Sequence, residues 1–298
     1  MAEQPRVPKG QPTGGRWSKP GGGGTRGATS TRGDWSGAGG NPSALSNKER
    51  EERLEGPVAA SEILPGGISE TYKVTLEDGT VGNFKVDAGK NMARGAETEV
   101  LAWEVAKIVG MEDMVPAATI REMDDPKLRG SYAEWMEGTP AKRVRPNKMF
   151  GNSEEDLQRA AMFDHILGNG DRHDGNWVIN DEGKIGLIDH NIMLGTPQPY
   201  SQFLSQVNAE LKDKPVAPYV KPYIDNLDKI IATVEKSGVS DSEGLKIKWL
   251  KQRVRRAKEA NTWEDITGEE GDLEFFESRE DIGTDELMAE LGDAWKDA

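Results

Sequence analysis

The chain has 298 residues, a formal net charge of −14 and a hydrophobic fraction of 35%. This acidic balance argues against generic nucleic-acid binding. The absence of cysteine excludes disulfides and thiolate metal sites. The sequence has no apolar segment at its N-terminus and no apolar run near 18 residues. We therefore expect neither a secretion signal nor a transmembrane segment, and a cytoplasmic location.

Composition separates two unusual ends from a middle that can form a core. Residues 1–56 are rich in Gly, Pro and Arg without hydrophobic periodicity, which predicts a disordered leader. Its isolated tryptophans could dock on a protein partner, or the leader could simply be a solubilising segment. Residues 261–298 carry fourteen acidic and two basic side chains and are predicted to be an acidic tail. The middle is long enough for one two-lobed fold.

The first part of the middle, residues 57–138, has the pattern of a small antiparallel sheet with one helix. Alternating apolar residues on both sides of the turn at 77–80 predict a β-hairpin. Gly110 follows a helical segment and is a suitable C-terminal capping residue. The expected elements are strands at 68–76, 81–86, 116–123 and 131–136, and a helix at 96–109.

The second part, residues 139–260, is predicted to be mainly helical, which makes the whole fold α+β. Ser153 followed by three acidic residues is a favourable helix start. The expected elements are helices at 153–168, 200–212, 218–237 and 242–260, and short strands at 177–180 and 184–188. The last helix carries seven Lys/Arg residues between Lys246 and Lys258. These could neutralise the acidic tail, which we favour, or meet an anionic lipid surface.

All three histidines lie in one 26-residue window, 165–190, which also contains the most informative polar spacing. Asp171 is followed five residues later by Asn176, and Asp189 comes thirteen residues after that. Hard oxygen ligands around a polar loop and a hairpin suit Mg²⁺ held against phosphates. Asp171 is placed to orient or deprotonate an attacking hydroxyl. The alternative is an ordinary polar loop capped by Asp and Asn side chains.

Two neighbours of Asp171 are candidates for a supporting role at the same site. Arg172 and His173 could bond loop carbonyls, or they could stabilise charge on a transferring group. The pattern leaves both possibilities open.

The first part of the middle offers a cation for the phosphates. Lys85 lies on a predicted strand between Phe84 and Val86 and should point to the opposite face from them. A strand lysine needs a carboxylate to hold it, and the predicted helix offers Glu97 and Glu99, of which we prefer Glu99.

A turn before the first predicted strand could also contact phosphates. Its glycines would let backbone N–H groups approach them closely. The candidate phosphate-binding residues of this turn are Gly66, Gly67 and Ser69.

These residues resemble a known family. The run Gly170-Asp171-Arg172-His173-x-x-Asn176, followed by Ile188-Asp189, resembles the catalytic loop and metal-binding motif of phosphatidylinositol 3-/4-kinase-like enzymes. The run Asn169-Gly170-Asp171-x-His173-x-x-Asn176 is also similar to HipA-type serine/threonine kinases. The resemblance implies a two-lobed protein-kinase-like fold over about 61–260, with ATP and Mg²⁺ as cofactors. Compact kinases of this pattern look like those of actinobacteria and their phages, and a phage protein could be virion-associated.

The resemblance also assigns roles to residues. It implies that Asp171 is the catalytic aspartate, that Asn176 and Asp189 bind Mg²⁺, and that Lys85 and Glu99 form the phosphate-binding ion pair. Asp164 would support the catalytic loop. The strand that resembles the adenine-binding hinge contains Glu134, Trp135 and Met136. One departure is that Asp-His-Asn, residues 189–191, stands where the family has Asp-Phe-Gly, which puts conventional activation-loop switching in doubt.

The predicted function is an ATP- and Mg²⁺-dependent kinase acting on a hydroxyl acceptor, either an inositol lipid or a protein. A HipA-like serine/threonine protein kinase is the nearest alternative. A catalytically weak kinase-like binding or virion-associated module is another. A metal-dependent hydrolase with His173 and His190 as ligands is a third, although it would leave Lys85 without a role.

Overall fold

The computed structural model describes much of the chain, namely residues 45–65, 70–87, 95–123, 128–144, 154–194, 203, 210–239 and 244–267. These residues fall into two compact units, each of which is described by itself. The first unit comprises the residues up to Ser153 together with Asp174–Asn191, and the second comprises Glu154–His173 and the residues from Ile192.

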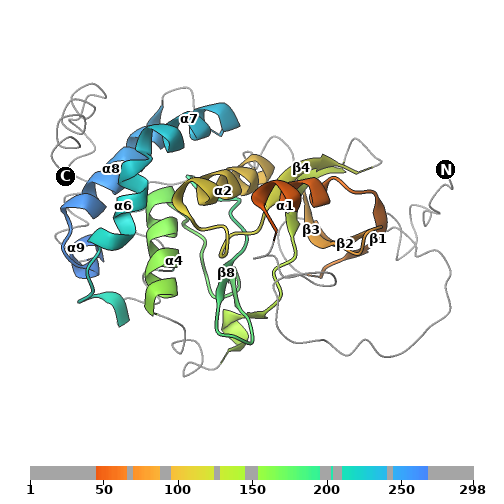
Figure 1. Cartoon of the computed structure of the whole chain (residues 1–298), viewed down its shortest axis with the longest axis horizontal. Coiled ribbons are helices and arrows are strands. Elements are labelled where there is room, and N and C mark those ends of the chain that lie inside the picture. The colour runs from red at the N-terminus through yellow and green to blue at the C-terminus, as the bar shows by residue number, and fades with distance from the viewer. Residues whose placement is uncertain are drawn as a thin grey trace. The chain divides into compact units, whose positions relative to one another are not determined.

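A five-stranded antiparallel sheet forms the centre of the first unit, with strand order β1-β2-β3-β5-β4. The helices α1 and α2 both contact β4 and β5 (Figure 1). The elements of this sheet and its helices are α1 (Asn47–Leu54), β1 (Val58–Ile63), β2 (Thr71–Leu76), β3 (Val81–Val86), α2 (Gly95–Val109), β4 (Ala118–Glu122) and β5 (Arg129–Glu134).

Strict alternation along β2 and β3 explains how this sheet forms its core. On β2 the residues Tyr72, Val74 and Leu76 are buried, while the residues between them are half-buried. Tyr72 pairs with Phe84 of β3, so the two aromatic rings lie on the same face, 6.4 Å apart. On β3, Gly82 is required because a Cβ there would lie 2.3 Å from the ring of Tyr132. The predicted hairpin is therefore confirmed.

A second, three-stranded sheet also belongs to the first unit, with strand order β6-β7-β8. Its strands are β6 (Thr139–Pro140), β7 (Trp177–Ile179) and β8 (Ile185–Leu187), and the short 3₁₀ helix η3 (Ala141–Arg143) follows β6. The Leu187 N–H donates to the carbonyl of Met114 (2.8 Å), and the Lys142 N–H donates to that of Asp174 (2.8 Å). These bonds explain why residues 174–191 group with the first unit rather than with the predicted helical part.

The second unit is helical, as predicted. It contains α4 (Glu154–Leu167), α6 (Ala217–Asp225), α7 (Leu227–Ser237), α8 (Leu245–Glu259) and α9 (Trp263–Thr267). Helices α4, α6 and α8 contact one another. The buried Trp263 of α9 donates from its indole N–H to Gln158 Oε1 on α4 (2.9 Å). The α+β class predicted from the sequence is confirmed, with an antiparallel sheet first and helices afterwards.

The structure corrects the predicted elements at three places. Residues 47–54 form helix α1 within the predicted disordered leader, because Ser46 caps the helix and Leu54 is fully buried. The predicted helix 218–237 is broken at Asn226, whose side chain takes over the bond to the Pro222 carbonyl (2.8 Å). Helix α9 occupies the start of the predicted acidic tail. Residues 1–44, and most of the predicted helix 200–212, lie outside the described residues.

No helix among the described residues is long and apolar enough to cross a membrane.

Helix α1 is anchored by an ion pair that the sequence did not predict. The guanidinium of Arg50 donates to both carboxylate oxygens of Glu134 at the end of β5, and to the carbonyl of Glu112 (2.8 Å). It also lies 4.5 Å from the centre of the Trp103 ring. The side chains of Arg50 and Glu134 are only 6% and 18% exposed.

Replacing Arg50 should therefore destabilise the fold. We expect Arg50→Ala to lower the free energy of unfolding by about 3–5 kcal/mol, because it leaves a largely buried Glu134 carboxylate unpaired. Lys48→Ala on the same helix is the control, since Lys48 is 83% exposed in its pair with Glu52 and should cost less than about 1 kcal/mol. Chemical denaturation measures both. Equal effects of the two changes would show that Arg50 does not anchor α1.

Candidate functional site

Lys85 is held between two carboxylates inside the first unit. Its ammonium lies 3.2 Å from Glu99 Oε1 and 2.7 Å from Asp189 Oδ1, and its side chain is 12% exposed. Burial alone would lower the pKa of Lys85, but the charges of Glu99 and Asp189 outweigh it and raise the pKa. Lys85 is therefore a fixed cation. It projects from β3 on the face opposite Phe84, as predicted.

Close packing of β3 against β5 sets the position of Lys85. Its strand partner is Ser131. The preceding residue on β5, Gly130, lies very close to β3. A Cβ at position 130 would lie 2.0 Å from the Lys85 carbonyl oxygen. A larger residue at position 130 would push the two strands apart and displace the lysine.

Helix α2 supplies the carboxylate that holds Lys85. Of the two candidates, Glu99 makes this ion pair, as predicted, whereas Glu97 binds Arg129 (2.7 Å). Glu99 is 7% exposed and also accepts a hydrogen bond from the backbone N–H of His190 (3.0 Å). Burial alone would raise the pKa of Glu99, but Lys85 and His190 outweigh it and lower the pKa to about 2.

Asn176 and Asp189 lie at the adjoining ends of β7 and β8. Asn176 precedes Trp177, which pairs with Leu187, and the Ile188 N–H donates to the Asn176 carbonyl (3.0 Å). Asp189 has a positive φ of 62°, a conformation that is costly for a residue other than glycine and is typical of functional sites. Asn176 is 7% exposed, and the Asp189 side chain is 31% exposed.

The donors at these two positions fit a hard divalent cation. A carboxamide and a carboxylate supply the oxygen ligands that Mg²⁺ prefers when substrate phosphates and water complete its coordination. Within the described part of the chain, no group of three or more His, Cys, Asp or Glu side chains could by itself hold a metal ion.

The predicted catalytic loop belongs to the second unit and is built around a buried ion pair. Arg172 donates to both oxygens of Asp164 (2.8 and 3.1 Å), and both side chains are 0% exposed. Asn169 accepts from the N–H of Asp171 (3.1 Å). The loop leaves α4 at Gly168, whose φ of 60° suits glycine. This arrangement holds the backbone of Asp171 while its side chain remains half-buried.

The structure corrects the roles predicted for Arg172 and His190. Arg172 is fully buried, so it does not fit the predicted role of stabilising charge on a transferring group. The alternative prediction gave it loop carbonyls as partners, and the structure shows it bound to the Asp164 carboxylate. His173 is half-buried. His190, a metal ligand in the hydrolase hypothesis, is 1% exposed and turns its ring to Glu99 instead.

The predicted hinge residues are only partly compatible with adenine binding. The Glu134 carboxylate is occupied by Arg50 and by the N–H of Ala117 (3.1 Å). The backbone N–H groups of Glu134 and Trp135 donate to the carbonyls of Ala117 (2.9 Å) and Val81 (3.0 Å). These bonds stabilise the fold, so of the three predicted residues the buried Met136 remains the candidate. Gly66, Gly67 and Ser69 lie outside the described residues.

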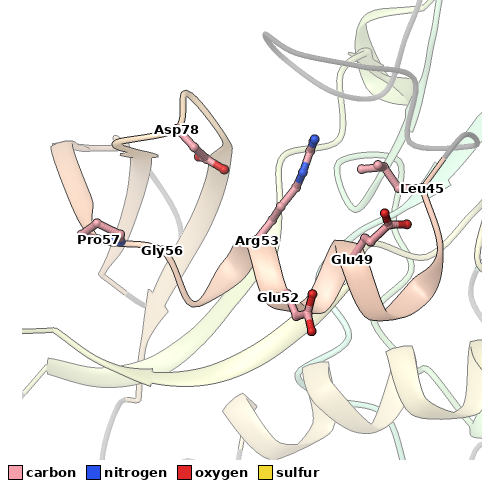
Figure 2. A pocket seen from close by; sticks show the side chains of 7 residues that line it. All are labelled: Leu45, Glu49, Glu52, Arg53, Gly56, Pro57 and Asp78. Carbon is pink, nitrogen blue, oxygen red and sulfur yellow. The ribbon is translucent and has the colours of Figure 1, made fainter.

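A separate surface pocket of about 340 Å³ lies between α1 and the β2–β3 turn. Figure 2 shows the side chains that line it, among them Glu49, Glu52 and Arg53 of α1 and Asp78 of the turn. None of the residues predicted to bind nucleotide or metal lines it.

One comparison with known proteins agrees with the sequence resemblance. The family model described as phosphatidylinositol 3- and 4-kinase matches residues 148–245, a segment that includes Asp171, Asn176 and Asp189. This match confirms the resemblance to that family and supports a kinase-like phosphotransferase domain in this part of the chain. Among curated proteins, none matches the sequence.

Two solved structures are similar to the chain at low identity. A crystal structure of the Golgi casein kinase has a TM-score of 0.42 and 12% identity, over 78% of this chain and 76% of that one. A structure of the Golgi casein kinase with Mn/ADP bound has a TM-score of 0.44 and 11% identity, over 78% of this chain and 77% of that one.

The second unit also contains a buried histidine that should make stability depend on pH. Burial, together with the nearby Arg253 and Arg256, lowers the pKa of His165 from 6.5 to about 3. The unfolded chain therefore binds a proton below pH 6.5 that the folded chain excludes. Stability should fall by about 1.4 kcal/mol for each pH unit below about 6.5, or about 2 kcal/mol at pH 5.

Denaturation of the wild type and of His165→Leu at pH 7 and pH 5 measures this effect. The wild type should lose about 2 kcal/mol more than the variant between these two pH values. The Glu99 carboxyl, with its lowered pKa, would titrate only below about pH 4.5, so it does not contribute in this range. Identical losses in the two proteins would show that His165 is not buried in its neutral form.

Proposed function

We propose that this protein is an ATP- and Mg²⁺-dependent kinase that transfers the γ-phosphate to a hydroxyl group. The observation that carries the proposal is the buried set formed by Lys85, Glu99 and Asp189, in which one lysine bonds two carboxylates from distant segments. Burying the Lys85 ammonium and the Glu99 carboxylate, 12% and 7% exposed, is costly and stabilises a fold poorly. Such a set is therefore better explained by a ligand than by stability.

The charges of this set favour a nucleotide that arrives with a metal ion. One lysine and two carboxylates leave a net charge of −1, which would repel free phosphates. A divalent cation on Asp189 and Asn176 would reverse this balance and let Lys85 contact the phosphates. The metal would neutralise charge on the transferring group. The residues of the chain hold it, orient the nucleotide and position the acceptor.

Asp171 is proposed as the group that accepts the proton of the attacking hydroxyl. Its backbone N–H donates to Asn169, the neighbouring Arg172 is bonded to Asp164, and Asp171 itself is half-buried. The family match at residues 148–245 includes this loop. An inositol lipid and a protein side chain both offer the required hydroxyl. One experiment with two arms, one for each acceptor, distinguishes between them.

The test incubates the full-length protein with Mg²⁺ and ATP labelled at the γ-phosphate, with phosphatidylinositol vesicles in one arm and cell extract in the other. Label on lipid identifies a lipid kinase, and label on protein identifies a protein kinase. Asp171→Asn should lower kcat by about 10²–10⁴-fold, because it removes the proton acceptor, while nucleotide binding measured by calorimetry persists.

Two further variants make this test specific. Lys85→Met should weaken ATP use, whereas Lys48→Met, at an exposed position on α1, should leave it unchanged. Turnover that survives Asp171→Asn would overturn the proposal. Nucleotide binding without any transfer by the wild type would instead favour the kinase-like binding module.

A further inference from the structure

Three consecutive residues follow Ile188 after the end of β8. The first of them is bonded to Lys85 of β3, and the other two are bonded to helix α2. Asp189 bonds Lys85, His190 bonds Glu99, and the carbonyl of Asn191 accepts from the Thr98 hydroxyl (3.1 Å). His190 and Asn191 are therefore attached to the N-terminal half of α2 at consecutive positions, while Asp189 is attached to β3 through Lys85. The second of these bonds involves the carboxylate that holds Lys85, so it bears directly on the candidate site.

His190 contacts Glu99 through both its backbone and its side chain. The backbone N–H donates to Oε1 (3.0 Å), and the ring Nδ1 lies 3.3 Å from Oε2. A carboxylate only accepts hydrogen bonds, so the ring must carry its proton on Nδ1 to donate here. The ring is 1% exposed and the Glu99 side chain is 7% exposed, so water does not substitute for either bond.

These contacts leave the Glu99 carboxylate one orientation. The terminal torsion of a glutamate is broad and has roughly two-fold symmetry, so one bonded oxygen does not fix it well. Here Oε1 receives Lys85 and the His190 N–H, while Oε2 receives the imidazole. An aromatic side chain at position 190 would keep the backbone bond and lose the second anchor.

We propose that His190 is a positioning residue, which fixes the Glu99 carboxylate and through it the ammonium of Lys85. This inference rests on the proposed kinase function and adds a way in which its ion pair is kept assembled. Hydrogen bonds to charged groups are stronger than bonds between neutral groups.

The test compares His190→Phe with His190→Asn in the full-length protein. Phenylalanine keeps a planar ring but removes the donor, while asparagine presents an amide N–H close to the position of Nδ1. We expect His190→Phe to lower kcat by about 10-fold or more, in line with a lost hydrogen bond to a charged group, with KM for ATP within about threefold of the wild type. His190→Asn should restore most of kcat despite its smaller volume.

Thr98→Val is the matched control. It removes a bond between the same two segments without touching Glu99, so it should lower the melting temperature and leave kcat within about threefold. A merely structural role for His190 would make His190→Phe behave like Thr98→Val, with reduced stability and unchanged kcat. That result, or failure of asparagine to rescue, would overturn the positioning role.

The two proposals fail in different ways. If the wild type transfers no phosphate to either acceptor arm, the proposed function is overturned. If the wild type transfers phosphate and His190→Phe does so with the same kcat, the function stands and the positioning role of His190 is overturned.

Discussion

The contact of Lys85 with Glu99 and Asp189 is the interaction on which the first unit depends. Its members come from β3, from α2 and from the residue after Ile188, three segments separated by up to 104 positions in the sequence. A buried charge that loses its partner is strongly destabilising. The sheet, helix α2 and the β7–β8 hairpin must therefore keep these three segments in fixed relative positions. Small displacements would separate the charges and lower the stability of the fold.

Several local features are explained by this requirement. Gly130 lets β5 approach β3 at the lysine, and Gly82 makes room for Tyr132 nearer the start of β3. Asp189 accepts a left-handed backbone, which points its side chain to Lys85 while the next residue turns to Glu99. The strain at Asp189 is thus offset by two bonded neighbours, in agreement with the general observation that strained residues persist only where the surroundings fix them.

Local patterns in the sequence predicted several elements correctly, whereas features that depend on tertiary contacts were missed. The bounds of β3 agree with the prediction, and α2 differs by one residue, because alternation and helix propensity are local signals. Helix α1 was missed because its sequence is almost entirely polar and its stability comes from Arg50, which bonds a residue 84 positions away. Glu134 was predicted to bind nucleotide because its strand resembles the adenine-binding hinge, whereas in the structure its carboxylate binds Arg50.

Within the candidate site too, contacts suggested by local patterns were predicted and contacts between distant segments were missed. The Lys85–Glu99 pair was predicted because a strand lysine requires a carboxylate and the helix offered two. The contact of His190 with Glu99 joins residues 91 positions apart, so no local pattern could predict it. The sequence did show that histidine stands at position 190 where the resembled family has an aromatic residue. Its role could not be predicted, because the sequence does not show that Glu99 lies beside it.

Exposure and charge balance distinguish the Asp164–Arg172 pair from the group formed by Lys85, Glu99 and Asp189. Asp164 and Arg172 are both 0% exposed and neutralise each other one to one, so nothing is left for a ligand to bind. Lys85, Glu99 and Asp189 keep an excess negative charge, and Asp189 keeps 31% of its side chain exposed. A balanced, sealed pair serves to hold a loop, whereas an unbalanced group with one accessible carboxylate is poised for a cation. The first unit therefore carries the unbalanced group that the proposed function assigns to a metal ion and nucleotide, and the second holds the loop that carries Asp171.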